Sequence, residues 1–373
     1  MKTVISIGYP ILVLGVFAWS IWYISFRLRI LFGLKKKWPL LLAVSLYFIV
    51  SLIPMFSSAD SISTTTGLLN IAGGYFFTFY LFTLLLLLVL HIVQLKWTLN
   101  GKKAAISTML LSLMVTVGGA LWANQFTVNI VEIELAGLKQ DVKVMHLSDI
   151  HIGHHRGKEY LTRIVVETNR LKPDVVLLNG DLVDSNVALL PGTLSALADF
   201  DAPVFFTGGN HDNYVNTERL FEIITQHGVR ILHNEIVDFA GIYWIGLDYM
   251  KPDNETFDMH PSKDKRTIKE ILPQIPLKED KPSVLIHHSP VGIKYISERG
   301  IDLMLSGHTH AGQIFPGTLI MSVFFPFNKG LHKKDDLQVF TSQGAGTYGP
   351  RVRIGTSNEI NFLHLKVAKL RDI

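Results

Sequence analysis

Five short clusters of side chains of the kind that bind metal ions lie between Asp149 and His310 in the sequence. They are Asp149-Ile150-His151, Gly180-Asp181-Leu182-Val183-Asp184, Gly209-Asn210-His211-Asp212, His287-His288-Ser289-Pro290 and Gly307-His308-Thr309-His310. Their oxygen and nitrogen atoms suit Mn, Zn or Fe, and sulfur ligation is excluded because the chain contains no cysteine. The clusters therefore predict a hydrolytic centre with two divalent transition-metal ions.

Such a centre has a defined chemistry. One carboxylate placed between two clusters bridges two ions about 3.5–4 Å apart, and the pair stabilises the attacking and leaving oxygens of a phosphoryl displacement. Asp181 is the expected bridge. The expected nucleophile is a metal-bridging hydroxide, formed when the bridging water loses a proton near neutral pH. No serine or cysteine nucleophile is then required.

The elements that must position these clusters can be predicted from the residues before them. Each cluster follows an apolar run rich in β-branched residues, at 142–147, 175–178, 204–206, 284–286 and 303–305. Such runs are typical of buried strands, and residues 160–171 and 217–227 between them have a helical pattern. Because open α/β sheets place ligands at the carboxyl ends of their strands, we expect the five clusters to converge on one rim.

The motif set resembles that of the calcineurin-like metallophosphoesterases, in particular the membrane-anchored bacterial branch. Asp-x-His, Gly-Asp-x-x-Asp, Gly-Asn-His-Asp, His-x-Pro and Gly-His-x-His are all present and in order, and the similarity covers residues 142–366. The resemblance implies a four-layer α/β/β/α sandwich with two mixed sheets. It also implies two sets of metal ligands that share one residue: Asp149, His151, Asp181 and His310, and Asp181, Asn210, His288 and His308.

The resemblance further assigns the residues beside the metals. The family's His-x-Pro register selects His288 over the adjacent His287 as a ligand. His211 is expected to act as general acid or transition-state stabiliser, with Asp184 orienting its imidazole. Near the C-terminus, a Gly-rich segment at 344–353 carries Arg351 and Arg353. Either of these arginines binds substrate, or both are solvated residues of a turn.

The first third of the chain has a different composition. Four segments, at 4–24, 38–56, 68–93 and 104–123, are apolar and free of charge, and a bilayer core of roughly 30 Å requires about 20 such residues per helix. We therefore expect a membrane anchor of four transmembrane helices at 1–123 and a metallophosphoesterase domain at 124–373. The first segment is alternatively a signal peptide, which its length and the lack of a clear cleavage site disfavour.

Charge predicts how the chain is oriented in the membrane. Residues 1–123 contain nine of the 35 basic residues and one of the 31 acidic ones, so their net charge is +8 and the remainder is net −4. The basic balance thus belongs to the membrane segment and gives no support to nucleic-acid binding. The loops 27–37 and 96–103 carry five and three basic residues, whereas 57–67 and 124–137 carry none. The positive-inside rule predicts a multi-pass membrane protein with an extracytoplasmic second domain.

The function expected from these features is hydrolysis of phosphate ester or pyrophosphate bonds. A membrane-tethered domain gains effective concentration against substrates in or near the bilayer, so lipid-linked or cell-envelope phosphates are the favoured substrates. The alternative is a non-catalytic membrane scaffold or sensor of the same fold, which the complete ligand set disfavours. Transport is disfavoured because His91 is the only ionisable residue in the four apolar segments.

Overall fold

The computed structural model describes residues 2–56, 61–256, 262 and 265–368. Its residues form two compact units. The helical unit comprises residues 1–57, 68–121 and 349–352, and the sheet unit comprises residues 58–67, 122–348 and 353–373. The expected division into a membrane anchor at 1–123 and a second domain at 124–373 stays a prediction.

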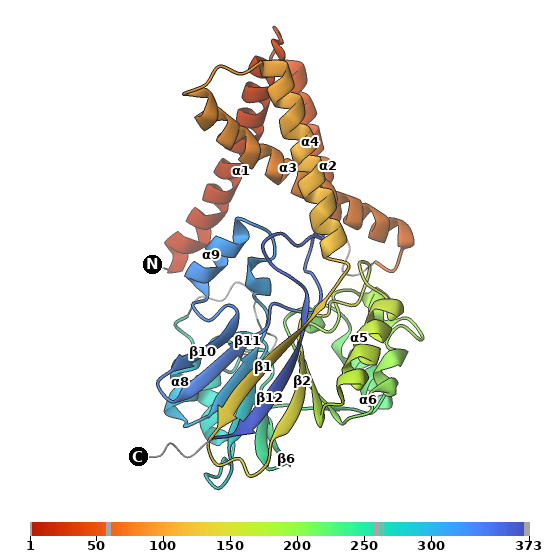
Figure 1. Ribbon diagram of the computed structural model, residues 1–373, viewed down its shortest axis with the longest axis vertical. Helices are drawn as coiled ribbons and strands as arrows, with labels where there is room; N and C mark the ends of the chain where they lie inside the picture. Colours follow the sequence, from red (N-terminus) through yellow and green to blue (C-terminus); the bar gives the residue numbers. More distant parts are fainter. Residues whose placement is uncertain (1, 57–60, 257–261, 263–264, 369–373) are drawn as a thin grey trace. The chain divides into compact units, whose positions relative to one another are not determined.

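The helical unit is built from α1 (Lys2–Phe32), α2 (Trp38–Phe56), α3 (Thr64–Gln94) and α4 (Gly101–Trp122) (Figure 1). Among the described residues, three stretches are long and apolar enough to cross a membrane: Ile11–Phe32, Thr64–Gln94 and Gly101–Trp122. The apolar stretch of α2, Trp38–Ile53, is shorter. The chain therefore has the helices of a membrane protein, and the expected count of four spans stays a prediction.

The helical unit has a packed interior and an apolar exterior. Tyr23, Phe48 and Tyr80 lie in a buried cluster, and the Phe48 and Tyr80 rings are 4.9 Å apart. A hydrogen bond of 2.6 Å joins the hydroxyls of Ser20 and Tyr80. The opposite sides of the same helices expose large apolar side chains such as Leu46. Apolar side chains on the outside and polar pairs on the inside are the pattern expected in lipid.

The first sheet of the sheet unit contains the first three motif strands. Its strand order is β1 (Thr127–Leu135), β12 (Glu359–Val367), β2 (Val142–Leu147), β3 (Val175–Asn179), β4 (Val204–Thr207) and β5 (Val229–Ile231). Strands β2 to β5 are parallel to one another. Strand β12 is antiparallel to β2, and β1 is parallel to β12. The sheet is therefore mixed, and the carboxyl ends of β2, β3 and β4 lie along one edge.

The second sheet contains the other two motif strands. Its order is β10 (Gly330–Lys334), β11 (Leu337–Thr341), β9 (Leu303–Ser306), β8 (Ser283–Ile286), β7 (Ile242–Gly246) and β6 (Glu235–Phe239). Strands β7, β8, β9 and β11 are parallel, while the edge strands β6 and β10 are antiparallel to their neighbours. This sheet is mixed as well, as expected.

Three apolar cores hold four layers together. Alternate residues of β2 point to opposite faces of the sheet: Val144 packs between the two sheets, and Met145 packs toward the helices. The helices α5 (Lys158–Leu171) and α6 (Thr217–Gln226) cover the first sheet, and α7 (Ile268–Ile271) and α8 (Ile293–Glu298) cover the second. The α/β/β/α sandwich expected from the family resemblance is confirmed.

The predicted elements lie close to the observed ones. The five apolar runs before the motifs are all strands, with ends within one residue of those expected. The region 250–280 contains α7 and a 3₁₀ turn at Leu272–Gln274, while its residues 257–261 and 263–264 lie outside the described residues, as do residues 57–60 of the loop 57–67. Two further helices, α8 and α9 (Gly317–Phe324), were not expected.

Candidate metal centre

The five motifs meet at the carboxyl ends of their strands. Strands β2, β3 and β4 lead to Asp149, Asp181 and Asn210, and β8 and β9 of the other sheet lead to His288 and His308. The two sheets are joined directly at this rim, because His288 Nε2 lies 3.1 Å from Asp181 Oδ2. The structure thus brings together the ligand residues that the sequence places in five separate clusters.

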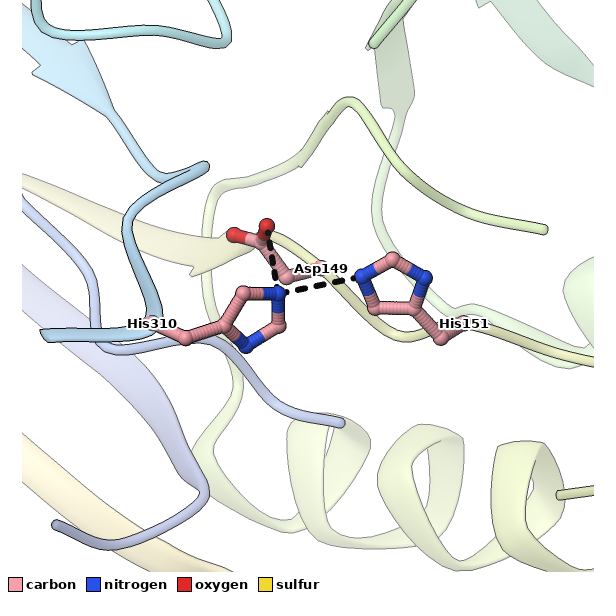
Figure 2. A group of neighbouring side chains, drawn as sticks. All are labelled: Asp149, His151 and His310. Atoms are coloured by element: carbon pink, nitrogen blue, oxygen red, sulfur yellow. Dashed lines mark hydrogen bonds and ion pairs between the residues drawn. The ribbon is translucent and has the colours of Figure 1, made fainter. Parts of the chain in front are cut away.

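Asp149, His151 and His310 form the first group of converging side chains (Figure 2). His310 Nε2 lies 3.3 Å from Asp149 Oδ1 and 3.1 Å from His151 Nε2. All three residues are buried. Two imidazole nitrogens and a carboxylate oxygen at these distances form a cradle for one transition-metal ion.

Asp181, His288 and His308 form the second group. Asp181 also faces the first group, because its Oδ2 atom lies 3.7 Å from His151 Nε2. One carboxylate oxygen is therefore within 4 Å of a histidine from each group. This position is the one expected of a bridging ligand.

The hydrogen bonds around the site leave His288 Nε2 and the amide oxygen of Asn210 available to bind a metal ion. His288 Nδ1 donates to the carbonyl oxygen of Asn179 at 2.8 Å, which fixes the proton on Nδ1 and leaves Nε2 to face Asp181. The buried amide oxygen of Asn210 has no hydrogen-bond partner among the described residues. A buried acceptor without a donor is costly, and a bound cation would satisfy it. The donor set and its orientation therefore fit divalent metal ions.

His287 is used differently from its neighbour. Its Nδ1 atom donates to the carbonyl oxygen of Ser289 at 2.7 Å, and its Nε2 atom accepts from the backbone N–H of Met250 at 3.3 Å. Both ring nitrogens of His287 are thus occupied by backbone groups. His288 belongs to the second ligand group, whereas His287 belongs to neither, and the ligand role expected of His288 stays a prediction.

Five of the seven expected ligands have left-handed backbone conformations. The φ angles are +56° at Asp149, +54° at His151, +53° at Asp181, +70° at His308 and +47° at His310. Non-glycine residues rarely adopt these angles, and each costs of the order of 1–3 kcal/mol. The surrounding contacts must therefore hold these residues in the left-handed conformation. This conformation lets side chains from neighbouring loop positions point toward the same place.

Two motif glycines allow this close packing. A Cβ atom at Gly209 would lie 2.2 Å from Asp181 Oδ1, and one at Gly307 would lie 2.3 Å from Asp149 Oδ2. Real side chains do not come this close, so each carboxylate occupies space that only a glycine leaves free. The glycines of Gly-Asn-His-Asp and Gly-His-x-His therefore make room for the ligands of the neighbouring motifs.

A buried acid holds two motif loops together. The Asp212 carboxylate accepts backbone N–H groups of Asp181 and Gly209, both at 2.8 Å, and of Val183 at 3.1 Å. Burial raises the pKa of Asp212 to about 7. Asp212 fixes the loop after β3 against the loop after β4, so Asp181 and Asn210 are held in register.

Burial and mutual charge set the protonation of the ligands. Burial lowers the pKa of His151 and of His310 well below the ordinary value, so both imidazoles are neutral, which is the form that binds metals. Burial alone would lower the pKa of His288, but the Asp181 and Asp149 carboxylates outweigh it and raise that pKa to about 10. A bound dication would neutralise the negative charge of these two carboxylates in place of the proton on His288.

His211 lies at the edge of this constellation. Its ring packs edge-on against His151 at 4.8 Å and lies 5.3 Å from the Tyr348 ring. Its backbone N–H donates to Asp181 Oδ1 at 2.8 Å. The imidazole is close enough to His151 and Asp181 to form a third metal-binding group with them. The arrangement therefore permits His211 to act either as a metal ligand or as the expected general acid.

The expected orienting role of Asp184 stays a prediction. Burial raises the pKa of Asp184 to about 7, opposed by a hydrogen bond from Ser185 and by the charge of Arg156. A Cβ atom built on Gly153 would lie only 1.9 Å from Asp184 Oδ1, so the Asp184 carboxylate occupies space that only a glycine leaves free. Asp184 is thus packed against the loop that follows the first motif.

The structure gives Arg353 a role that differs from the expected contact with substrate. Its side chain is 1% exposed, and its Nη1 atom donates to the His310 carbonyl at 2.9 Å. Nη2 donates to the carbonyls of Gln343 and Gly346, at 2.6 and 2.7 Å, and Nε donates to Asn358 Oδ1 at 2.9 Å. These bonds hold the Gly-rich loop and the His310 loop together, so Arg353 supports the site. Arg351 belongs to the helical unit, and its expected role stays a prediction.

A cavity of about 170 Å³ opens over both ligand groups. Its lining includes Asp181, Asn210, His211, His308 and His310, together with Gln313, Met321, Phe325 and Tyr348. The last four were not expected from the sequence. Gln313 also fixes Tyr348, because its amide bonds both the N–H and the carbonyl of Tyr348, at 2.9 and 2.8 Å. The apolar run that follows Gly-His-x-His in the sequence could have indicated that Met321 and Phe325 line the site.

Comparison with known proteins agrees with this geometry. The calcineurin-like phosphoesterase family matches residues 142–312. An uncharacterized metallophosphoesterase of Helicobacter pylori (strain J99) is 34% identical over 62% of this chain and 62% of its own length. A transmembrane protein with metallophosphoesterase domain from Danio rerio is 32% identical over 61% of this chain and 54% of its own. YpbG of Bacillus subtilis is 30% identical over 61% of this chain and 82% of its own.

The chain belongs to the calcineurin-like phosphoesterases, a family of metal-dependent phosphoesterases. The alignments span a little under two thirds of the length of the first curated relatives, 62% and 63%. Together with its apolar helices, the similarity to transmembrane relatives makes it a membrane protein of this family.

Proposed function

We propose that the protein hydrolyses phosphate ester or pyrophosphate bonds with two divalent transition-metal ions. The observation that carries the proposal is the position of Asp181, whose carboxylate faces His151 on one side and His288 on the other. One ion would be held by Asp149, His151, Asp181 and His310, and the other by Asp181, Asn210, His288 and His308. When bound, such ions supply Lewis-acid activation of water and of phosphoryl oxygens.

The chain's own residues complete the reaction. His211, which lines the cavity beside the ligands, would give a proton to the leaving oxygen of the substrate. Met321, Phe325 and Tyr348 line the same cavity and restrict water. A cavity of about 170 Å³ is smaller than those that enclose whole drug-sized ligands, roughly 300–1,000 Å³. The phosphate-bearing part of the substrate therefore enters, and the rest stays outside.

A panel of substrates and metals tests this function. The purified full chain, loaded with Mn, Zn, Fe or Mg, is offered a phosphomonoester, a phosphodiester and a lipid pyrophosphate. We expect hydrolysis of at least one class, loss of activity in a chelator, and recovery when the metal is restored, because the ions activate the water. Full metal occupancy without hydrolysis of any class would support a scaffold or sensor instead.

We further propose that the helices form a four-span anchor with the sheet unit on the extracytoplasmic side. The support is the charge of the loops: five basic residues lie at 27–37 and three at 96–103, against none at 57–67 and 124–137. Substrates of the membrane or cell envelope, lipid-linked phosphates among them, are then the ones within reach.

A reporter fused after Ile373 tests this orientation. We expect alkaline phosphatase at that position to be active and a fluorescent protein that matures only in the cytoplasm to be dark, because the basic loops are retained inside. A matched pair of fusions within the loop 96–103 should give the opposite result. The reverse pattern at both positions would place the sheet unit in the cytoplasm, with soluble or inner-leaflet substrates.

A further inference from the structure

Helix α9 exposes an unusual amount of apolar surface for part of a folded sheet unit. Leu319, Ile320, Val323 and Phe324 are 61%, 54%, 78% and 64% exposed, and none of the eight residues of α9, all of which the structure describes, is buried. The helix sequence GTLIMSVF contains no charged residue. A contiguous apolar patch of this kind marks a surface that something covers.

The rest of the described sheet unit does not show such a cluster. Its other strongly exposed apolar side chains, such as Ile130 and Val166, occur singly along the sequence. Isolated exposed residues are normal on a folded protein. The concentration at α9 is therefore a local feature of this helix.

Helix α9 is attached to the metal-binding loop. The Gly317 N–H donates to the Ile314 carbonyl at 2.7 Å, and a Cβ atom at Gly312 would lie 2.3 Å from the Gly317 carbonyl oxygen. From α9 and the residue after it, Met321 and Phe325 reach the cavity that His308 and His310 line. The helix therefore stands at the mouth of the cavity, with Met321 and Phe325 directed inward and the more exposed side chains outward.

The chain leaves its last apolar helix at the same rim. Strand β1 begins at Thr127, which pairs with Glu359, and two residues further along β12 Asn361 pairs with His146 of β2. The start of β1 is thus level with the carboxyl end of β2, where Asp149 lies. The Ala123 carbonyl accepts from Arg156 at 2.8 Å and from Asn358 at 2.7 Å, so the entry segment is fixed to the site loops.

The position of the end of α4 indicates which part of the sheet unit lies next to the lipid. Helix α4, which is long and apolar enough to cross a membrane, ends at Trp122, five residues before β1 begins. The Trp122 indole donates to the Thr356 carbonyl at 3.0 Å, at a position typical of the bilayer interface. With α4 spanning the membrane, as proposed above, the chain leaves the membrane at the rim of the sheet unit that carries the metal ligands.

The charge next to α9 also favours a lipid surface. Lys329 and Lys333 follow the helix, whereas Lys334 is paired with Asp335, and no acidic residue occurs between Asp302 and Asp335. Basic residues beside an apolar helix are attracted to anionic headgroups. Binding of a helix at the lipid–water interface grows with the apolar area that it buries and with electrostatic attraction to anionic lipids.

We propose that α9 lies in the lipid–water interface with Leu319, Ile320, Val323 and Phe324 among the acyl chains, so that the metal cavity opens onto the bilayer surface. The substrate that this arrangement selects is the phosphate or pyrophosphate head of a membrane lipid, which reaches the ligands past Met321 and Phe325 while its chains stay in the bilayer. The choice of substrate rests on the proposed hydrolysis, whereas the position of α9 rests only on α4 spanning the bilayer.

Fluorescence tests the position of α9 without any assay of activity. Because the chain has no cysteine, Val323→Cys introduces a single thiol, which is labelled with the environment-sensitive dye NBD in the full chain reconstituted into phosphatidylcholine–phosphatidylglycerol vesicles. We expect blue-shifted emission and quenching by nitroxide-labelled lipids. The matched control is Val166→Cys, a 63% exposed valine on α5, which should be quenched only by iodide in the water.

Two other results would overturn the proposal. If the dye at Val323 is quenched by iodide as strongly as at Val166, α9 lies in water. If the dye is shielded from both quenchers, the surface is covered by protein, as in contact with a second copy of the chain.

Kinetics with two kinds of substrate tests the choice of lipid. In the variant Leu319→Glu/Val323→Glu, we expect the rate against a lipid phosphate in vesicles to fall by about tenfold or more, since two charges oppose insertion of the helix. The rate against a soluble phosphodiester should stay within about twofold of the unsubstituted chain, and Val166→Glu should change neither. Equal rates on the vesicle substrate would refute the lipid selectivity. If the unsubstituted chain hydrolyses no phosphomonoester, phosphodiester or pyrophosphate, the proposed function fails, while the quenching result still decides the position of α9.

Discussion

Asp181→Asn is expected to remove metal from both ligand groups and to lower activity by more than about 100-fold. The substitution keeps the shape of the side chain but removes the charge of the oxygen that faces both His151 and His288. Even residues that only orient metal ligands are worth roughly 10–100-fold in affinity or activity, so a shared ligand is worth more. Elemental analysis of the purified protein should show about two equivalents of metal in the unsubstituted chain and well under two in the variant.

An exposed aspartate provides the control for this prediction. Asp201→Asn makes the same chemical change at the protein surface and should leave both metal content and activity unchanged. One equivalent or none in an active, folded unsubstituted chain would contradict a centre of two ions. Retention of both ions by Asp181→Asn would show that another residue bridges them.

The sequence predicted the strands and the meeting of the motifs well, for a physical reason. The runs before the motifs are continuously apolar because both faces of each strand are buried, as Val144 and Met145 of β2 illustrate. A strand of this kind has clear ends, since the ligand motif begins where the apolar run stops. Parallel strands then bring those ends to one edge, so Asp149 and Asp181 were expected together although their motifs are far apart in the sequence.

The arrangement of backbone and side chain around the ligands could not be predicted in the same way. The role of Arg353 depends on carbonyl groups of Gln343, Gly346 and His310, and every residue type presents the same carbonyl. The left-handed conformations of Asp149 and Asp181 likewise follow from tertiary contacts, because neither sequence position contains a glycine. The sequence therefore indicated which residues gather but not what holds them.

Helix α9 shows a different limit of sequence reasoning. A short apolar run such as that around Leu319 and Val323 is equally compatible with a buried element and with an exposed one, since apolar composition does not say what surrounds a segment. In the structure no residue of α9 is buried, so the segment is an exposed element. The same ambiguity does not affect α3, because a 31-residue apolar helix is too long for the core of a small unit.

His211→Ala is expected to lower turnover by about 10²–10⁴ while both metal ions stay bound. The range is the usual contribution of a positioned general acid or base, and His211 lines the cavity beside the ligand groups. Its effect should depend on the leaving group. A simple alkyl phosphate ester needs its leaving oxygen protonated and should show the full loss, whereas a p-nitrophenyl ester leaves as a stable anion and should lose much less. Turnover of both esters and the metal content of the same preparation are the measurements.

The control and the contrary outcomes separate acid catalysis from metal binding. His227→Ala, at a histidine that follows α6 outside the ligand groups, should change neither turnover nor metal content. Imidazole added to His211→Ala should restore part of the rate on the alkyl ester if the missing group is a proton donor. Loss of an ion from His211→Ala would instead make His211 a ligand with His151 and Asp181, as their spacing permits. An equal loss for both esters with both ions retained would leave His211 a positioning residue, because a group that does not protonate the leaving oxygen cannot distinguish a good leaving group from a poor one.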